Sequence, residues 1–271
     1  MNEKELAIKR LLISILEAIF EPSDVYQGFI VRVIPKELKR EGQYKHFERT
    51  IQLNNLTRSP LELCLTCLRC LAMHVDTVNS EFFYESEGMY PILQKLLEAS
   101  LELGIFSIRE IDELEQRGKI DDIVANCGNS AVWTLKYPLL PVAYDVYVSN
   151  GYAIKGELRR WSYDYQKEGK VWHKSFSSQE EAIQEKERLW ETAAEIKVEV
   201  TTKLERTFDF AYYVAVKPAL ELNDLFQEHG YAYEAYGVKK HYVKKVPTKK
   251  FFQEREFLML YEVPFTIKLP K

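Results

Sequence analysis

Three of the chain's four cysteines lie on one short segment together with an arginine and a histidine. Cys64, Cys67 and Cys70 are spaced three residues apart, and Arg69 and His74 lie among or just after them. This spacing is typical of bacterial-type iron–sulfur ligation, in which thiolates hold the metal. An arginine can bind a phosphate through two parallel hydrogen bonds, and a histidine titrates near neutral pH. The segment therefore offers either metal chemistry or phosphate chemistry.

The same residues also fit an ordinary amphipathic helix. Ser59 and Glu62 form a capping box, and Pro60 stands at the first helical position, where a missing N–H costs nothing. At 100° per residue, two of the cysteines share a face with leucine and valine. A straight helix would keep the three thiolates from converging on one ion, because the first and third lie about two turns apart. We therefore predict a helix over residues 60–79 whose cysteines are reduced core residues. No metal and no cofactor are expected, and an iron–sulfur or zinc site at these cysteines is the alternative.

The pair Arg69 and His74 resembles the Arg-x4-His signature of HEPN-type ribonucleases. That resemblance implies metal-independent cleavage of RNA by a dimer, in which the two residues polarise the scissile phosphate and assist the ribose 2′-OH. In the other interpretation, Arg69 lies on the solvated face of the helix and His74 at the edge of the core. We predict that both residues are dispensable for any RNA cleavage, with the ribonuclease as the alternative function.

A second candidate site is the lysine segment, residues 239–250. It holds six lysines, with His241 and Tyr242 among them and Phe251 and Phe252 directly after. Such a cluster attracts polyanions although the net charge of the chain is -4, and interleaved aromatic rings can stack on exposed bases. We predict that it contacts nucleic acid or, as second choice, an acidic protein partner. A solvated loop or a lysine-rich edge strand that discourages aggregation is the structural alternative. The predicted contact residues are Lys239, Lys240, Tyr242, Lys244, Lys245, Lys249 and Lys250.

The first half of the chain is predicted to be mainly helical. Apolar spacing, capping boxes and glycine stops predict helices over residues 3–20, 60–79, 89–103, 107–117 and 119–126. Short β-branched runs at 29–34 and 50–53 predict two strands of a small hairpin. The composition changes near residue 128. We therefore predict an α+β fold with a mainly helical domain, residues 1–128, followed by an α+β domain, residues 129–271.

The second half contains a predicted hairpin and helix unit. Residues 157–165 and 171–176 alternate like paired strands, and a helix is predicted over 179–196. The run from Arg160 to Ala182 resembles the arm-type DNA-binding domain of phage integrases, which implies a sheet that enters the major groove. The alternative is a hairpin packed on its own helix for structural reasons. A strand at 209–216 and a helix at 218–229 follow.

Composition and absent motifs limit the function classes. The 271 residues are 46% hydrophobic, which is enough for buried cores. There is no run of 18 apolar residues and no basic, apolar leader at Met1, so we expect a cytoplasmic protein without a membrane contact. Phosphate-binding loops, nucleophile elbows and two separate Cys-x2-Cys pairs of zinc-ribbon spacing are missing. We predict a nucleic-acid-associated accessory or interaction protein without its own catalytic site, whose helical half is a candidate surface for a protein partner.

Overall fold

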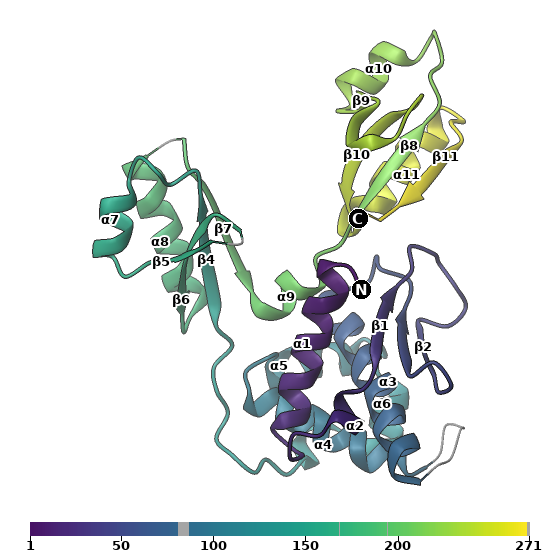
Figure 1. Ribbon diagram of the computed structural model, residues 1–271, viewed down its shortest axis with the longest axis vertical. Coiled ribbons are helices and arrows are strands. Elements are labelled where there is room, and N and C mark those ends of the chain that lie inside the picture. Colours follow the sequence, from purple (N-terminus) through teal and green to yellow (C-terminus); the bar gives the residue numbers. More distant parts are fainter. Residues whose placement is uncertain (81–86, 168, 194, 270–271) are drawn as a thin grey trace. The chain divides into compact units, whose positions relative to one another are not determined.

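The computed structural model describes residues 1–80, 87–167, 169–193 and 195–269 (Figure 1). Of the described residues, 46% are helical and 20% lie in strands, so the predicted α+β class is confirmed. Its backbone contacts define two units, of which the first combines residues 1–93 and 208–271 and the second spans 94–207. The predicted cut after residue 128 lies inside the second unit. In the described part of the chain, no helix has both the length and the apolarity needed to cross a membrane.

The first unit contains two sheets. Its elements up to residue 80 are α1 (Glu3–Glu17), α2 (Asp24–Gln27), β1 (Ile30–Val33), β2 (Gly42–Lys45), β3 (Thr50–Leu53) and α3 (Pro60–Ser80). Its C-terminal elements are β8 (Ala211–Val216), α10 (Asn223–Glu228), β9 (Ala232–Tyr233), the 3₁₀ turn η2 (Ala235–Gly237), β10 (Tyr242–Pro247), the 3₁₀ turn η3 (Thr248–Lys250), α11 (Phe251–Leu260) and β11 (Phe265–Lys268).

The second unit holds one sheet and several helices, and two helices cross its boundaries. The crossing helices are α4 (Met89–Glu102) and α9 (Lys203–Phe208). Between them lie α5 (Ile108–Gln116), α6 (Asp121–Cys127), η1 (Ser130–Val132), β4 (Tyr144–Ser149), α7 (Lys155–Arg160), β5 (Asp164–Gln166), β6 (Val171–Phe176), α8 (Gln179–Thr192) and β7 (Lys197–Thr202).

The N-terminal sheet has the order β1-β3-β2, with β1 parallel and β2 antiparallel to β3. The prediction of a hairpin between residues 29–34 and 50–53 is therefore wrong, because the antiparallel partner of β3 is β2. No strand signal in the sequence marks β2, which lies at the end of the charged stretch 36–45. Helix α3 packs against β2 and β3. The approach is close: a Cβ added at Gly42 would lie 2.5 Å from Thr66 Cγ2.

The predicted helix at residues 60–79 is confirmed as α3. Its capping box is present, because Glu62 N donates to Ser59 Oγ over 3.3 Å and Ser59 N donates to Glu62 Oε2 over 3.0 Å. One further detail was not expected. Asp76, placed on the solvated face by the helical period, is only 7% exposed.

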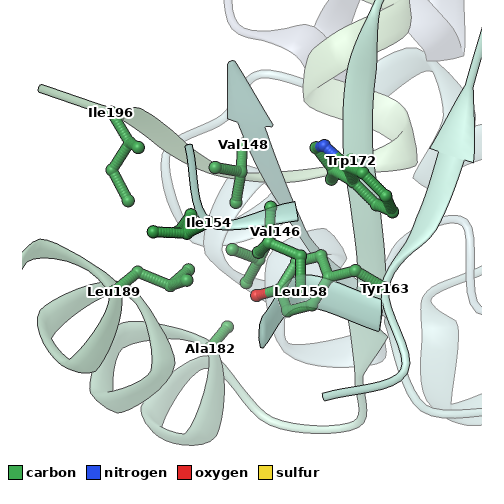
Figure 2. Packing of buried hydrophobic residues seen from close by; sticks show 9 residues of the cluster. All are labelled: Val146, Val148, Ile154, Leu158, Tyr163, Trp172, Ala182, Leu189 and Ile196. Atoms are coloured by element: carbon green, nitrogen blue, oxygen red, sulfur yellow. The ribbon is translucent and has the colours of Figure 1, made fainter. Parts of the chain in front are cut away.

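The sheet of the second unit is antiparallel throughout, in the order β5-β6-β4-β7. Figure 2 shows its core, in which Val146 and Val148 of β4 point toward Leu158 and toward Leu189 of α8. The prediction of a strand over residues 157–165 is wrong in its first half. Ile154 and Leu158 are both buried and stand four residues apart, which is helical spacing, so α7 forms there.

The C-terminal sheet has the order β11-β8-β10-β9, again fully antiparallel. Helices α10 and α11 cover one face: the rings of Phe226 and Tyr242 lie 5.8 Å apart, and those of Tyr212 and Phe251 lie 4.9 Å apart. The middle of the lysine segment is part of this sheet. Its strand β10 pairs with β8 along its whole length and with β9 at two residues, so neither a free loop nor a simple edge strand describes it.

Candidate nucleic-acid interface

The lysine segment is held on a fixed scaffold. Two of its lysines lie in the turn before β10, two lie on the strand, and two lie in the 3₁₀ turn η3 after it. Six strand residues span about 20 Å, so the charges extend along a full strand length. Five of the six lysines are exposed to solvent: Lys239, Lys240, Lys245, Lys249 and Lys250.

The sixth lysine, Lys244, points to the face that the helices cover. Its Nζ donates to Glu254 Oε2 over 2.6 Å, and Tyr231 donates its hydroxyl to Glu254 Oε1 over 2.8 Å. Glu254 is only 6% exposed. A carboxylate buried to this degree needs a paired cation. Burial, with the neighbouring Glu254, raises the pKa of Tyr231. Lys244 therefore has a structural role.

Tyr242 also belongs to the helix-covered face. It is 7% exposed, and its ring centroid lies 5.3 Å from that of Tyr233. Its hydroxyl accepts a hydrogen bond from Gln227 Nε2 over 3.1 Å. Phe251 is likewise buried, whereas Phe252 is 52% exposed. Of the predicted contact residues, Tyr242 and Lys244 thus face inward and the other five face solvent.

The opposite face of the sheet carries a row of alternating charge and aromaticity. Lys245 follows Lys244 and so points to the other side of β10. In the register of the sheet, Lys245 lies opposite Tyr213 of β8, and Tyr213 lies opposite Lys268 of β11. Both lysines are exposed. One rung therefore places a tyrosine between two lysines, and adjacent strands are about 5 Å apart.

Tyr213 is covered by a second tyrosine from the β9–β10 connection. The rings of Tyr213 and Tyr236 are stacked, with centroids 4.5 Å apart and an interplanar angle of 18°. Tyr236 is itself 54% exposed. Its backbone has φ +53°, the left-handed region that side chains other than glycine rarely adopt. The stack therefore holds a strained residue in place.

The rest of this connection is fixed by hydrogen bonds. Glu234 N donates to His241 O over 2.8 Å, and Lys240 N donates to Glu234 Oε1 over 3.0 Å. Glu234 and Lys240 also have left-handed backbones, with φ 52° and 58°. The β9–β10 connection thus presents Tyr236 from an ordered turn.

The arginine and histidine of α3 both lie near Tyr44 but differ in their burial and partners. Arg69 lines a cleft of about 350 Å³ with Tyr44 and Cys70. His74 is 0% exposed: its Nδ1 accepts from the Tyr44 hydroxyl over 2.8 Å, and its Nε2 donates to Tyr26 O over 3.1 Å. Burial lowers the pKa of His74 to about 4. Both ring nitrogens are therefore occupied, and five helical residues turn the two side chains about 140° apart.

The cysteines behave as core residues. Cys64, Cys67, Cys70 and Cys127 form no disulfide and are all buried, which confirms the predicted burial of the first two. Burial raises the pKa of the Cys64 thiol to about 12. Within the described ranges, no group of three or more histidine, cysteine or acidic side chains is placed to hold a metal ion. That the protein carries no metal stays a prediction.

A further polar cluster lies on the sheet of the second unit. His173 Nε2 lies 3.0 Å from Asp145 Oδ1, and Ser175 Oγ donates to the same oxygen over 2.7 Å. Ser175, His173 and Asp145 are the residue types of a hydrolase triad. The connectivity differs from that of a triad, because Ser175 Oγ lies 3.3 Å from His173 Nε2, the same nitrogen that contacts Asp145. A nitrogen that donates to Asp145 cannot also accept the serine proton. This cluster therefore lacks the base that would activate the serine.

Comparison with known proteins does not place the chain in a family: no family model, curated protein or solved structure matches it. The site must therefore be judged by its geometry. Three of its residues were not among the predicted contacts: Tyr213, Tyr236 and Lys268. The strand pattern of residues 209–216 could have placed Tyr213 on one face. Nothing in the sequence indicates that Tyr236 folds back onto it.

Proposed function

We propose that this protein is a nucleic-acid-associated accessory or interaction protein that contacts its partner through the lysine segment and has no catalytic site of its own. The observation that carries the proposal is the exposure of five lysines along β10 and its two flanking turns. Lys244 already neutralises the buried Glu254, so the five exposed lysines are not required to pair with this carboxylate. They are available to polyanions.

Nucleic acid is favoured over an acidic protein by the aromatic residues beside the charges. An acidic peptide would pair with the lysines alone. A nucleic acid offers phosphates to the lysines and bases to exposed rings, and Tyr236 and Phe252 are both about half exposed. Neither Arg69 nor His74 enters this proposal, because His74 is fully buried and both of its ring nitrogens have partners within the protein.

The test is fluorescence anisotropy with labelled RNA and DNA over a series of salt concentrations. The variant replaces Lys239, Lys240, Lys245 and Lys249 by glutamine. We expect strong weakening and a flatter dependence of log affinity on log salt, because each lost phosphate contact changes the slope by about 0.7 for single strands. Thermal stability should hardly change, since exposed charges contribute little to folding.

A matched control variant loses the same number of charges elsewhere. It carries glutamine at the exposed lysines 36, 119, 167 and 203. If this control weakens binding as much as the test variant, net charge and not the segment is responsible, and the proposal fails. It also fails if the wild type binds no nucleic acid at low salt. If polyglutamate binds as tightly with the same lysine dependence, the partner is an acidic protein.

A further inference from the structure

The face of the C-terminal sheet opposite to α10 and α11 combines an aromatic stack with flanking cations. Tyr236 lies on Tyr213, and Tyr213 lies between Lys245 and Lys268 on one rung. Building on the proposed function, we infer that this face binds single-stranded nucleic acid by stacking a base on Tyr236, while Lys245 and Lys268 hold phosphates on either side of it. The ring and the two lysines together define the stacking site.

One side of the Tyr236 ring is already occupied, and the other is open. The inner side lies against Tyr213, while 54% of the residue remains exposed to solvent. A base added to the outer side extends an existing two-ring stack to three rings. Because the stack and the left-handed backbone already fix the side chain, binding does not have to order it.

The two lysines are spaced to contact the phosphates on either side of one nucleotide. Lys245 and Lys268 lie on strands that flank the strand of Tyr213, so their Cα atoms are separated by two strand spacings, about 10 Å. Each lysine is a point charge on a flexible stem. Two such side chains can reach the phosphates before and after a base that is stacked between them, and a polyanion complements both.

The aromatic platform requires unpaired bases. In a duplex the faces of the bases are covered by their neighbours, and only their edges and the phosphates are accessible. A protruding ring can stack only on a base that is free of the duplex stack. The site therefore discriminates single strands from duplexes by geometry, although its lysines attract both.

The experiment compares two tyrosines of the same hairpin that are equally exposed. Tyr233 is 53% exposed and Tyr236 is 54% exposed, but Tyr233 belongs to the helix-covered side, near Tyr242. The variants are Tyr236→Leu and, as control, Tyr233→Leu. A second variant, Tyr236→Gly, removes the ring at a position where glycine suits the left-handed backbone. Melting temperatures verify that each variant folds.

Binding is measured in the full chain by anisotropy with four probes. The probes are an oligothymidylate of about twelve nucleotides, an abasic strand of equal length, a duplex of equal length and polyglutamate. We expect both Tyr236 variants to lose roughly tenfold or more in affinity for oligothymidylate, with the abasic and duplex affinities nearly unchanged. Tyr233→Leu should bind as the wild type does. The double variant Lys245→Gln and Lys268→Gln should have a lower affinity for all four probes. For the single strand, its slope of log affinity against log salt should decrease by about 1.4.

The outcomes separate this inference from the function on which it rests. If lysine replacement abolishes binding but Tyr236→Leu and Tyr236→Gly bind oligothymidylate normally, the stacking site is refuted and the proposed function stands. If the abasic strand loses affinity as much as oligothymidylate, the ring supports the fold and does not stack on bases, which also refutes the site. If the wild type binds none of the nucleic acids, both proposals fail.

Discussion

The buried histidine of α3 should make the folding of the first unit dependent on pH. His74 has its folded-state pKa lowered to about 4, first by burial and then by the positive charges of Arg49 and Lys9, against hydrogen bonds to backbone groups that raise it. In the unfolded chain its pKa returns to about 6.5. Between these values the unfolded state binds a proton that the folded state does not. The contribution of the neutral His74 to the free energy of unfolding is therefore fully present above pH 6.5 and is lost as the pH falls toward 4.

The size of the effect follows from the pKa difference. One pKa unit corresponds to about 1.4 kcal/mol, so lowering the pH from 7 to about 4.5 should cost roughly 2 kcal/mol of the free energy of unfolding through His74 alone. Carboxylates also titrate in this range, so the pH dependence of wild-type unfolding is compared with that of a His74→Gln variant. Glutamine keeps a donor for Tyr26 O and an acceptor for the Tyr44 hydroxyl but cannot take up a proton near neutral pH.

The assay must report on α3. All four tryptophans lie in residues 94–207, so their fluorescence follows the second unit and serves as an internal control. Reactivity of the buried thiols of α3 toward a pyridyl disulfide, which still reacts at acid pH, follows the first unit over a urea series. A Cys127→Ser background removes the one thiol outside α3. Equal pH dependence in wild type and His74→Gln would refute the assignment of a buried neutral histidine.

Two packing predictions use the same assays. Gly42→Ala places a methyl group 2.5 Å from Thr66 Cγ2, so it should lower the stability of the first unit by about 1–3 kcal/mol, as measured by thiol reactivity. The same methyl group would lie 2.9 Å from the carbonyl oxygen of Gln52, so combining Gly42→Ala with Thr66→Ser should restore only part of the loss, and no recovery would contradict a clash with Thr66. Leu158→Ala removes a fully buried side chain and should cost about 2–5 kcal/mol in urea unfolding followed by tryptophan fluorescence. Leu158→Met should cost less than about 1.5 kcal/mol, and equal losses would argue against tight packing there.

Local signals in the sequence were sufficient for the longer helices of the first half. The capping box of Ser107 and Glu110 is present in the structure, as predicted, and α3 extends over the predicted residues. Capping and helical period depend on neighbours three or four residues away, so the sequence carries them directly. Predictions for short segments were wrong where a tertiary contact determines the structure. Leu158 belongs to a helical turn because it packs against β4 and β6, although the sequence around it alternates like a strand.

The candidate site was predictable only in part. A lysine-rich segment is visible in the sequence, but which face each side chain takes depends on the register of β10. That register turns Lys244 toward Glu254 and Lys245 toward Tyr213. Lys268 joins the site from a strand that is distant in sequence. Sequence patterns do not fix such long-range pairings, and they do not show a left-handed tyrosine.

The ordered turn around Tyr236 has a kinetic consequence. In the proposed stacking site the ring of Tyr236 already lies on Tyr213, so we expect no slow rearrangement to precede contact with a strand. The observed association rate should then rise linearly with strand concentration in a single phase. Differences among strands would be found in their residence times, as is usual for preformed surfaces.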